Sequence, residues 1–460
     1  MEASEMKEKL FYTKKTVFEK AGDKRVDAAY EYAVNYMKFL DAAKTEREAV
    51  IESIKMAEEA GFVSYKLGSP VKPGEKYYYN NRGKNIFLFT IGSESIENGI
   101  RISAAHIDSP RLDLKPCPLY EDNGMSFLKT HYYGGVRKYQ WVATPLALHG
   151  VVVKDDGTVI NVCVGEDESD PVFYINDLLP HLGADQSRKP LGEAFPGEKL
   201  NVLIGSRPFG EGADAVKLNA MRLINEKYGI TEEDFLSAEL SLVPAAKARD
   251  IGFDRALIGS YGHDDRVCAY PALTAIIENA NSTHTLMCIL ADKEETGSDG
   301  LTGMQCDIMV DLIDTISRSL GGDPAVVRAN SKCLSADVSA AFDPIFPEVF
   351  EKRNTPILNC GVVLTKYTGA RGKSSTNDAS AEYIAWLRQV MAKDEVVWQT
   401  GELGAVDVGG GGTVAKFISK HNIETVDLGV PVIAMHSPYE VIAKTDLYEA
   451  ALAFGAFCKY

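Results

Sequence analysis

The chain lacks several features that would place it in common protein classes. Its 460 residues contain no apolar run near the ~20 residues that a membrane span needs. Asp and Glu (65) outnumber Lys and Arg (49), and the resulting net charge of −16 disfavours nucleic acid as a partner. The start, MEASEMKEKLFYTKK, is charged and has no apolar core of a secretory signal. We therefore expect a cytoplasmic protein that binds neither membrane nor nucleic acid.

Several catalytic signatures are also missing. The 8 cysteines include no CxxC pair, which argues against a thiolate zinc ribbon and favours mostly buried, reduced thiols. There is no GxSxG elbow for a serine nucleophile and no GK[ST] phosphate loop. The glycine run at 409–412 is interpreted as a flexible turn, or as backbone that approaches a substrate closely.

The pattern along the chain predicts two domains, which also fits its length. Residues 24–60 have the apolar period of two helices. The outer segments alternate apolar strands with helical patterns, which predicts an α/β sheet with helices on both faces. Between them, residues 118–248 show a hairpin signal at Asp156-Gly157 and further short strands. We expect residues 1–117 and 249–460 to form one discontinuous domain, with 118–248 as an inserted, mostly β domain.

Side chains able to bind metals follow several of these strands or precede a helix. In open α/β sheets, ligands bind beyond the carboxyl ends of the strands. Imidazoles or carboxylates come at such places in five segments: His106-Ile107-Asp108, Asp264-Asp265, Glu294-Glu295, Asp337 and His436. We therefore expect these five segments to converge on one site.

Two imidazoles and several carboxylates form a ligand set that suits zinc, and also manganese or cobalt. One zinc ion needs about three protein ligands and a water. Two ions that share a carboxylate therefore need about five ligands, which the five segments supply. Two ions about 3.5–4 Å apart are the usual arrangement in hydrolases of this kind. The residues thus favour a hydrolase with two metal ions.

Local spacing suggests roles for some of these residues. Asp108 lies on the same side of an extended chain as His106, and can hold the ring by its other nitrogen. At Glu294-Glu295, one carboxylate can bind metal while the other takes a proton from water. Asp264 can cap the helix that follows, bridge two cations, or do both. Ordinary explanations stay open as well, namely a hydrogen-bonded histidine after a strand or a solvated acidic turn.

Taken together, the motifs resemble one metallopeptidase family, the aspartyl aminopeptidases and their vacuolar aminopeptidase I relatives. The order of the motifs matches over nearly the whole chain. The matching segments are His106–Pro110 with Lys115-Pro116, Asp264-Asp265, Glu294–Ser298, Ser335–Asp337 and Met435–Glu440. The resemblance implies a metallopeptidase domain built from both ends of the chain, with an inserted β domain between them.

The resemblance also implies the activity and the roles of the residues. It implies a two-metal aminopeptidase that removes N-terminal residues from peptides, with a metal-activated water as nucleophile. Asp264 is similar to the bridging carboxylate, and Glu294 to the general base. His106 and Asp337 would complete one metal site, and Glu295 and His436 the other.

The family implies a homo-oligomer, a tetrahedral dodecamer, in which a histidine of the inserted domain reaches a neighbouring active site. His181, in LLPHLG, is similar to that histidine, and is otherwise an ordinary loop residue.

The sequence departs from the family at Ala340 and Asp343, which replace histidines, and along the segment from Lys366 to Lys373. Lys366, Arg371 and Lys373 can bind an acidic side chain or a peptide carboxylate, or lie in a solvated loop.

Two rival functions stay open at this point. One is another two-metal amidohydrolase, such as a carboxypeptidase or an N-deacylase. The other is a non-catalytic protein that kept the fold.

Overall fold

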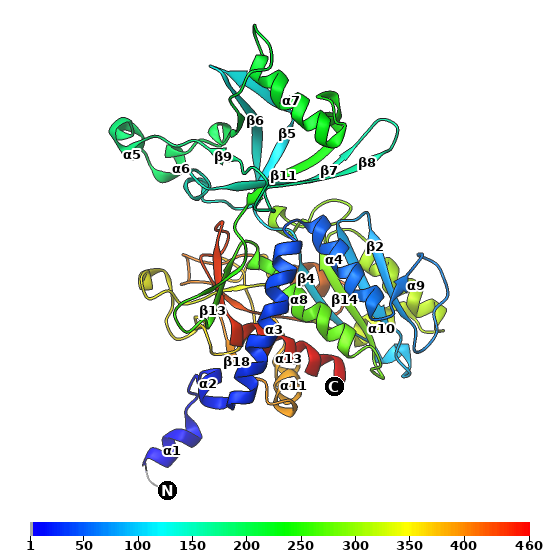
Figure 1. Ribbon diagram of the computed structural model, residues 1–460. Coiled ribbons are helices and arrows are strands. Elements are labelled where there is room, and N and C mark those ends of the chain that lie inside the picture. Colours follow the sequence, from blue (N-terminus) through cyan, green and yellow to red (C-terminus); the bar gives the residue numbers. More distant parts are fainter. Residues whose placement is uncertain (1–2) are drawn as a thin grey trace.

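The outer segments of the chain build a nine-stranded mixed sheet in the lower lobe of the computed structural model, which describes residues 3–460 (Figure 1). Its four central strands are parallel neighbours, so their carboxyl ends meet at one edge. Across the sheet the order is β1 (Val63–Ser64), β2 (Lys76–Asn81), β3 (Asn85–Thr90), β14 (Thr285–Ala291), β4 (Ile100–His106), β15 (Lys332–Ser335), β19 (Glu424–Gly429), β17 (Val362–Thr365) and β18 (Trp398–Thr400).

Apolar side chains project from both faces of this sheet, because successive residues of a strand point to opposite sides. In β3, Ile86 and Leu88 enter one core while Phe87 and Phe89 enter the other. The first core is covered by α3 (Asp23–Ala42), α4 (Glu46–Glu59), α8 (His263–Glu278), α11 (Ala381–Lys393) and α13 (Lys444–Lys459). The second is covered by α9 (Ile308–Ser319), α10 (Pro324–Asn330) and α12 (Ala415–Ser419). The predicted α/β sheet with helices on both faces is confirmed.

A smaller five-stranded sheet lies in the same lobe, in the order β12 (Arg249–Ile251), β13 (Leu257–Ser260), β21 (Glu440–Ala443), β20 (Pro431–Ile433) and β16 (Ser339–Ala340). The apolar run GVPVIAMHS, residues 429–437, is long enough to form a single strand of the main sheet. The structure instead divides the run, because β19 ends at Gly429 and β20 belongs to the smaller sheet.

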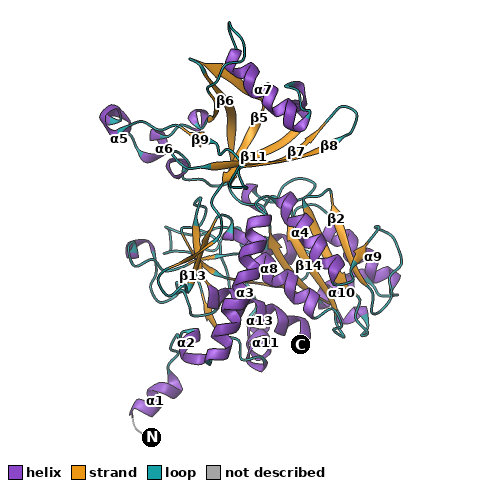
Figure 2. Ribbon diagram, in the orientation of Figure 1, coloured by secondary structure: helices purple, strands orange, loops and turns teal. Residues whose placement is uncertain are grey.

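The middle of the chain folds into a seven-stranded sheet in the upper lobe (Figure 2). Its order is β8 (Val159–Val164), β7 (Leu146–Val153), β11 (Ala238–Pro244), β5 (Arg111–Asp122), β6 (Met125–Tyr133), β10 (Val202–Gly205) and β9 (Tyr174–Ile175). The predicted hairpin joins β7 and β8. Helix α7 (Ala215–Tyr228) packs on β6 and was not predicted. Because β5 starts at Arg111, residue 118 falls inside a strand, and the division at 118 and 248 stays a prediction.

Helices α3 and α4 confirm the two helices predicted over residues 24–60. Helix α4 begins with a capping box, in which the Thr45 hydroxyl accepts from the Glu48 amide and the Glu48 carboxylate accepts from the Thr45 amide. Two short helices precede them, α1 (Ala3–Leu10) and α2 (Val17–Lys20), and α1 projects from the lower lobe (Figure 1).

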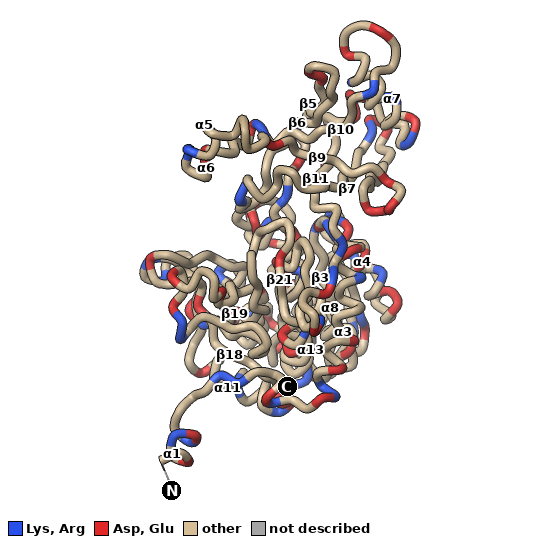
Figure 3. Tube along the Cα trace, turned by 60° about the vertical axis from the view of Figure 1, so that its left-hand side comes forward, with Lys and Arg blue, Asp and Glu red and all other residues tan. Residues whose placement is uncertain are grey.

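Acidic and basic residues are interspersed over both lobes (Figure 3). Five of the eight cysteines are buried, in line with the prediction of mostly buried thiols, whereas Cys117 and Cys163 are exposed. Within residues 3–460, no helix has the length and apolarity that a membrane crossing requires.

Candidate metal centre

The two sheets of the lower lobe together position the predicted metal-binding side chains. His106 is the last residue of β4, and Asp337 follows the end of β15. Glu294 and Glu295 lie in the short helix η6 (Glu294–Thr296) that follows β14. Asp264 follows β13 at the start of α8, and His436 follows β20. Segments far apart in sequence thus converge at the carboxyl edge of the main sheet.

Asp264 lies between the two imidazoles. Its Oδ1 is 3.0 Å from His106 Nε2, and its Oδ2 is 3.2 Å from His436 Nε2. On one side, His106 Nε2 is 3.8 Å from Asp337 Oδ1. On the other, His436 Nε2 is 3.6 Å from Glu295 Oε1. The site therefore consists of two half-sites that share one carboxylate.

The chemistry of this cluster fits divalent cations. Its ligand atoms form overlapping groups within 4.8 Å of one another, namely His106 with Glu294 and Asp337, His106 with Asp264 and Glu295, and Asp264 with Asp265 and Asp337. Glu295 Oε1 is buried and accepts no hydrogen bond from the described residues. Asp264 Oδ1 is buried beside the ring nitrogen of His106. Buried carboxylates at such density repel one another unless cations compensate their charge. Nitrogen and oxygen donors of this kind suit zinc.

The protonation of the carboxylates differs with their surroundings. Burial raises the pKa of Glu294 to about 8, and repulsion from Asp337 acts in the same direction. Burial would also raise the pKa of Asp264, but hydrogen bonds with His106 and His436 hold it well below its ordinary value. Asp264 is therefore held ionised between the two rings, whereas Glu294 readily takes up a proton.

Asp108 lies at the second ring nitrogen of His106, and it also supports a neighbouring part of the site. His106 Nδ1 donates to the backbone carbonyl of Asp108 at 2.9 Å, and the Asp108 carboxylate is farther away, at 3.4 Å. That carboxylate instead accepts from the backbone amides of Glu294 and Glu295, both at 3.2 Å, and from the Tyr133 hydroxyl at 2.7 Å. Asp108 thus fixes the backbone of the Glu294-Glu295 pair.

Glu440 is a supporting residue for which no role was predicted. Its carboxylate accepts from the backbone amides of Asp264 at 3.0 Å and of His436 at 2.7 Å. His436 has a left-handed backbone (φ 65°), which costs free energy and needs support from its surroundings. One buried carboxylate therefore orients the backbone of two predicted metal ligands. Glu440 lies within the Met435–Glu440 motif, which was the only sequence signal for it.

Asp264 is not the N-cap residue of α8, although the sequence had made that role possible. The N-cap residue is Gly262, and Asp264 and Asp265 have non-helical backbone angles within the first turn. The Ser109 hydroxyl donates to the Asp264 carbonyl at 2.6 Å, and Arg266 donates to the Ser109 oxygen at 2.9 Å. This leaves the Asp264 side chain directed at the two histidines.

A cavity of about 510 Å³ opens beside the cluster. It is lined by Asp264, Glu294, Glu295, Asp337 and His436, by Gly410–Gly412 of the glycine run, and by Thr368, Leu403, Lys416 and Met435 among others. The glycine run therefore brings backbone to the cavity wall, and its close approach to a substrate stays a prediction. Lys416 had not been singled out, because a lone lysine in a helical stretch carries no distinctive sequence signal.

The three predicted substrate-binding residues do not line this cavity. Lys366 is exposed, and Lys373 donates to Asp378 at 3.1 Å while its ammonium lies 3.7 Å from the Tyr367 ring centre. His181 is exposed in the short helix η3 (Pro180–Leu182), in the arm of the upper lobe that also carries α5 (Ala184–Ser187) and α6 (Leu191–Ala194) (Figure 1). Their roles stay predictions.

A buried set of imidazoles and carboxylates at the carboxyl edge of parallel strands defines the class as a metal-dependent hydrolase. Residues 39–458 match the family model described as Aminopeptidase I zinc metalloprotease (M18). The chain belongs to this family and is an aminopeptidase, a hydrolase that acts on peptide bonds. The family and activity predicted from the sequence are confirmed.

Relatives in sequence and structure agree with this assignment. The chain is 50% identical over 454 residues to "Probable M18 family aminopeptidase 1" of Clostridium acetobutylicum, covering 96% of this chain and 97% of that protein. An M18 aminopeptidase crystal structure from Thermotoga maritima has a TM-score of 0.93 and 42% identity, with 98% of this chain and 100% of that chain covered. The S. cerevisiae mApe1 dodecamer, at 20% identity, shares the fold with a TM-score of 0.77, over 95% of this chain and 97% of that chain.

Removing the charge of Glu440 tests its supporting role. We expect Glu440→Gln to lower the zinc affinity of the site by ~10–100-fold, as for other groups that orient metal ligands, because an amide cannot accept equally well from both backbone amides. Competition with a chelator of known affinity measures this. The control is Glu382→Gln on the exposed face of α11. Equal affinities in the two variants would contradict the role.

Proposed function

We propose that the aminopeptidase acts with two divalent ions, zinc by preference, that share Asp264. His106 and Asp337 hold one ion, and Glu295 and His436 hold the other. The observation that carries this proposal is the position of Asp264, whose two oxygens each face a different imidazole at 3.0 and 3.2 Å. In a site for one ion, the two oxygens of Asp264 would have no reason to face two different sets of ligands.

The ions, when bound, polarise the scissile carbonyl and make water acidic enough to lose a proton near neutral pH. Glu294 accepts that proton as the water attacks, and returns it to the leaving amine. The Asp108 carboxylate holds the Glu294 amide at 3.2 Å, so the base keeps its place through both transfers. Burial suits Glu294 to this role, because it raises the pKa of the carboxyl toward that of the proton donor.

Glu294→Gln separates proton transfer from metal binding. We expect the variant to keep its metal content and to lose ~10²–10⁴-fold in kcat, the typical contribution of a general base. Metal analysis and steady-state kinetics on the same preparation measure both properties. Asp299→Asn, an exposed change near η6, serves as the control. Near-normal turnover in Glu294→Gln would remove Glu294 from this role.

Metal removal and a matched substrate pair test the aminopeptidase mechanism itself. We expect chelation to abolish hydrolysis and two equivalents of zinc per chain to restore it. We also expect peptides with a free N-terminus to be cleaved and their acetylated counterparts to resist cleavage. Full recovery with one equivalent would contradict the two-ion proposal. Cleavage of acetylated peptides at equal rates would favour the N-deacylase or carboxypeptidase alternative.

We further propose that Lys416 contacts a carboxylate of the substrate. It is half-buried on the cavity wall, and within residues 3–460 no carboxylate forms an ion pair with it. Lys373, by contrast, is neutralised by Asp378. The Lys416 ammonium lies 4.7 Å from the centre of the Phe417 ring but has no carboxylate partner among the described residues. Such a cation on a cavity wall favours an anionic group of the ligand. The predicted roles of Lys366 and Lys373 become secondary in this proposal.

Matched substrates test Lys416. We expect Lys416→Met to lower kcat/KM for carboxylate-bearing substrates by ~10–100-fold, the cost of losing one charged hydrogen bond. The amide counterparts carry Asn in place of Asp at the first residue, or an amidated in place of a free C-terminus. We expect kcat/KM for these amide substrates to change little in the variant. The pair that responds identifies which carboxylate is bound. Lys373→Met is the control, and equal effects of the two variants would contradict the proposal.

The remaining expectations concern the whole molecule. We propose a discontinuous metallopeptidase domain of residues 1–117 and 249–460, an insertion of residues 118–248, and a cytoplasmic location. We also propose a homo-oligomer, with the tetrahedral dodecamer as its form, in which His181 reaches the active site of a neighbouring subunit. The exposure of His181 in a projecting arm supports this arrangement, because contact with another subunit needs such a position.

A further inference from the structure

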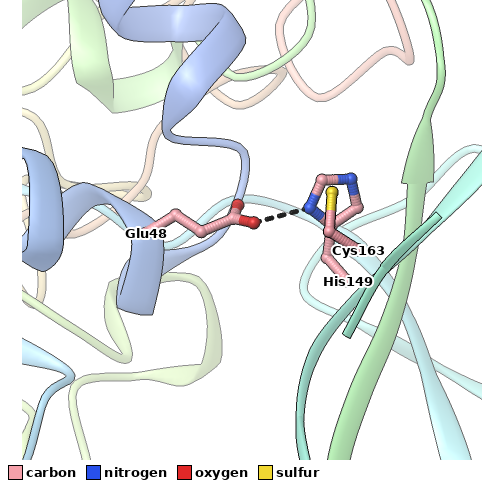
Figure 4. A group of neighbouring side chains, drawn as sticks. All are labelled: Glu48, His149 and Cys163. Atoms are coloured by element: carbon pink, nitrogen blue, oxygen red, sulfur yellow. Dashed lines mark hydrogen bonds and ion pairs between the residues drawn. The ribbon is translucent and has the colours of Figure 1, made fainter. Parts of the chain in front are cut away.

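A second group of metal-binding side chain types lies apart from the catalytic cluster, where the two lobes meet. Glu48 comes from α4 of the lower lobe, whereas His149 of β7 and Cys163 of β8 come from the sheet of the upper lobe. One ligand atom from each lies within 4.8 Å of the others. Figure 4 shows Glu48 approaching the His149 ring from across the junction, on the side where Cys163 lies.

Glu48 is fixed in this position by the start of its own helix. Its Oε2 accepts from the Thr45 amide at 3.0 Å and from the Thr45 hydroxyl at 3.1 Å. Its Oε1 is left to face His149 Nδ1 at 2.7 Å. The capping box therefore uses one carboxylate oxygen of Glu48 and leaves the other directed toward the upper lobe.

The opposite edge of the His149 ring is also held by a carboxylate. His149 Nε2 lies 3.0 Å from Glu166 Oε1, and Glu166 is anchored by Lys44 and Lys247, each at 2.6 Å. Histidines that bind metals usually donate their other ring N–H to a carboxylate, which fixes the tautomer. Glu166 is placed to accept from Nε2, which would leave Nδ1 to bind an ion together with Glu48.

We propose that Glu48, His149 and Cys163 form a further metal site, one that takes a zinc-class divalent ion and links the two lobes. The ligands are Glu48 Oε1, His149 Nδ1 and Cys163 Sγ, and water completes a four-coordinate shell. Binding releases two protons to solvent, one from Nδ1 and one from the thiol. The two positive charges of the ion then balance the carboxylate and the thiolate.

The competing arrangement is a plain ion pair without metal. Burial alone would lower the pKa of His149, but hydrogen bonds with Cys163, Glu166 and Glu48 raise it to about 11. The ring is thus a cation when no metal is bound, and an ion must displace its proton. Cys163 distinguishes the two arrangements, because an ion pair between His149 and Glu48 does not need a thiol.

Cobalt provides a probe that reports on this site alone. The proposed catalytic ligands are histidines and carboxylates, so only a thiolate-bound cobalt ion gives a sulfur-to-metal charge-transfer band in the near ultraviolet. We expect this band in the cobalt-loaded wild-type chain. We expect Cys163→Ser to lose the band and to bind one ion fewer per chain. Cys163 is exposed, so this small change should leave the fold intact.

Cys117→Ser is the matched control, because Cys117 is also exposed and also lies on a strand of the upper sheet. We expect it to keep both the band and the full ion count. His149→Gln should lose the band while the Cys163 thiol is still present. Absence of the band in the wild-type chain, or its persistence in Cys163→Ser, would overturn the proposal. The charge-transfer band and the number of ions bound per chain do not depend on catalysis. Failure of the two-ion mechanism would appear in the kinetic measurements and leave these two readouts unchanged.

Discussion

The shared position of Asp264 between His106 and His436 is the constraint on which the catalytic site depends. Each oxygen of that carboxylate faces a different imidazole, and further carboxylates surround each half-site. Such a concentration of buried negative charge is unfavourable by itself. Bound cations would remove this cost.

Backbone hydrogen bonds to two carboxylates, those of Asp108 and Glu440, keep these ligands in position. The Asp108 carboxylate holds the amides of Glu294 and Glu295, and the Glu440 carboxylate holds those of Asp264 and His436. These bonds position the main chain and leave the side-chain oxygens of the ligands free. Asp108 supports ligands that follow a strand of the main sheet, and Glu440 supports ligands that follow strands of the smaller sheet.

The junction of the two lobes also combines a histidine with carboxylates, and it adds the thiol of Cys163. Glu48, His149 and Glu166 form a chain of charge-assisted contacts between α4 and the upper sheet. Glu48, a member of the capping box of α4, thereby becomes part of a contact between the lobes. The added thiol of Cys163 makes this junction a softer ligand set than the catalytic one, and thus open to a different selection of metals.

The sequence by itself determined the alternation of strands and helices, because the apolar periods of β3, β14 and α3 are local properties of the chain. It also indicated which side chains follow strand ends, and thus most of the candidate ligands. Only the tertiary structure decided that β20 joins a separate sheet and that Lys416 faces the cavity. The fold likewise decided that the Glu440 carboxylate accepts hydrogen bonds from the backbone amides of two predicted metal ligands. It also decided that His149 meets Glu48, 101 residues away along the chain. The physical reason is that strand pairing and long-range hydrogen bonds depend on which segments pack together, and no local period records that choice.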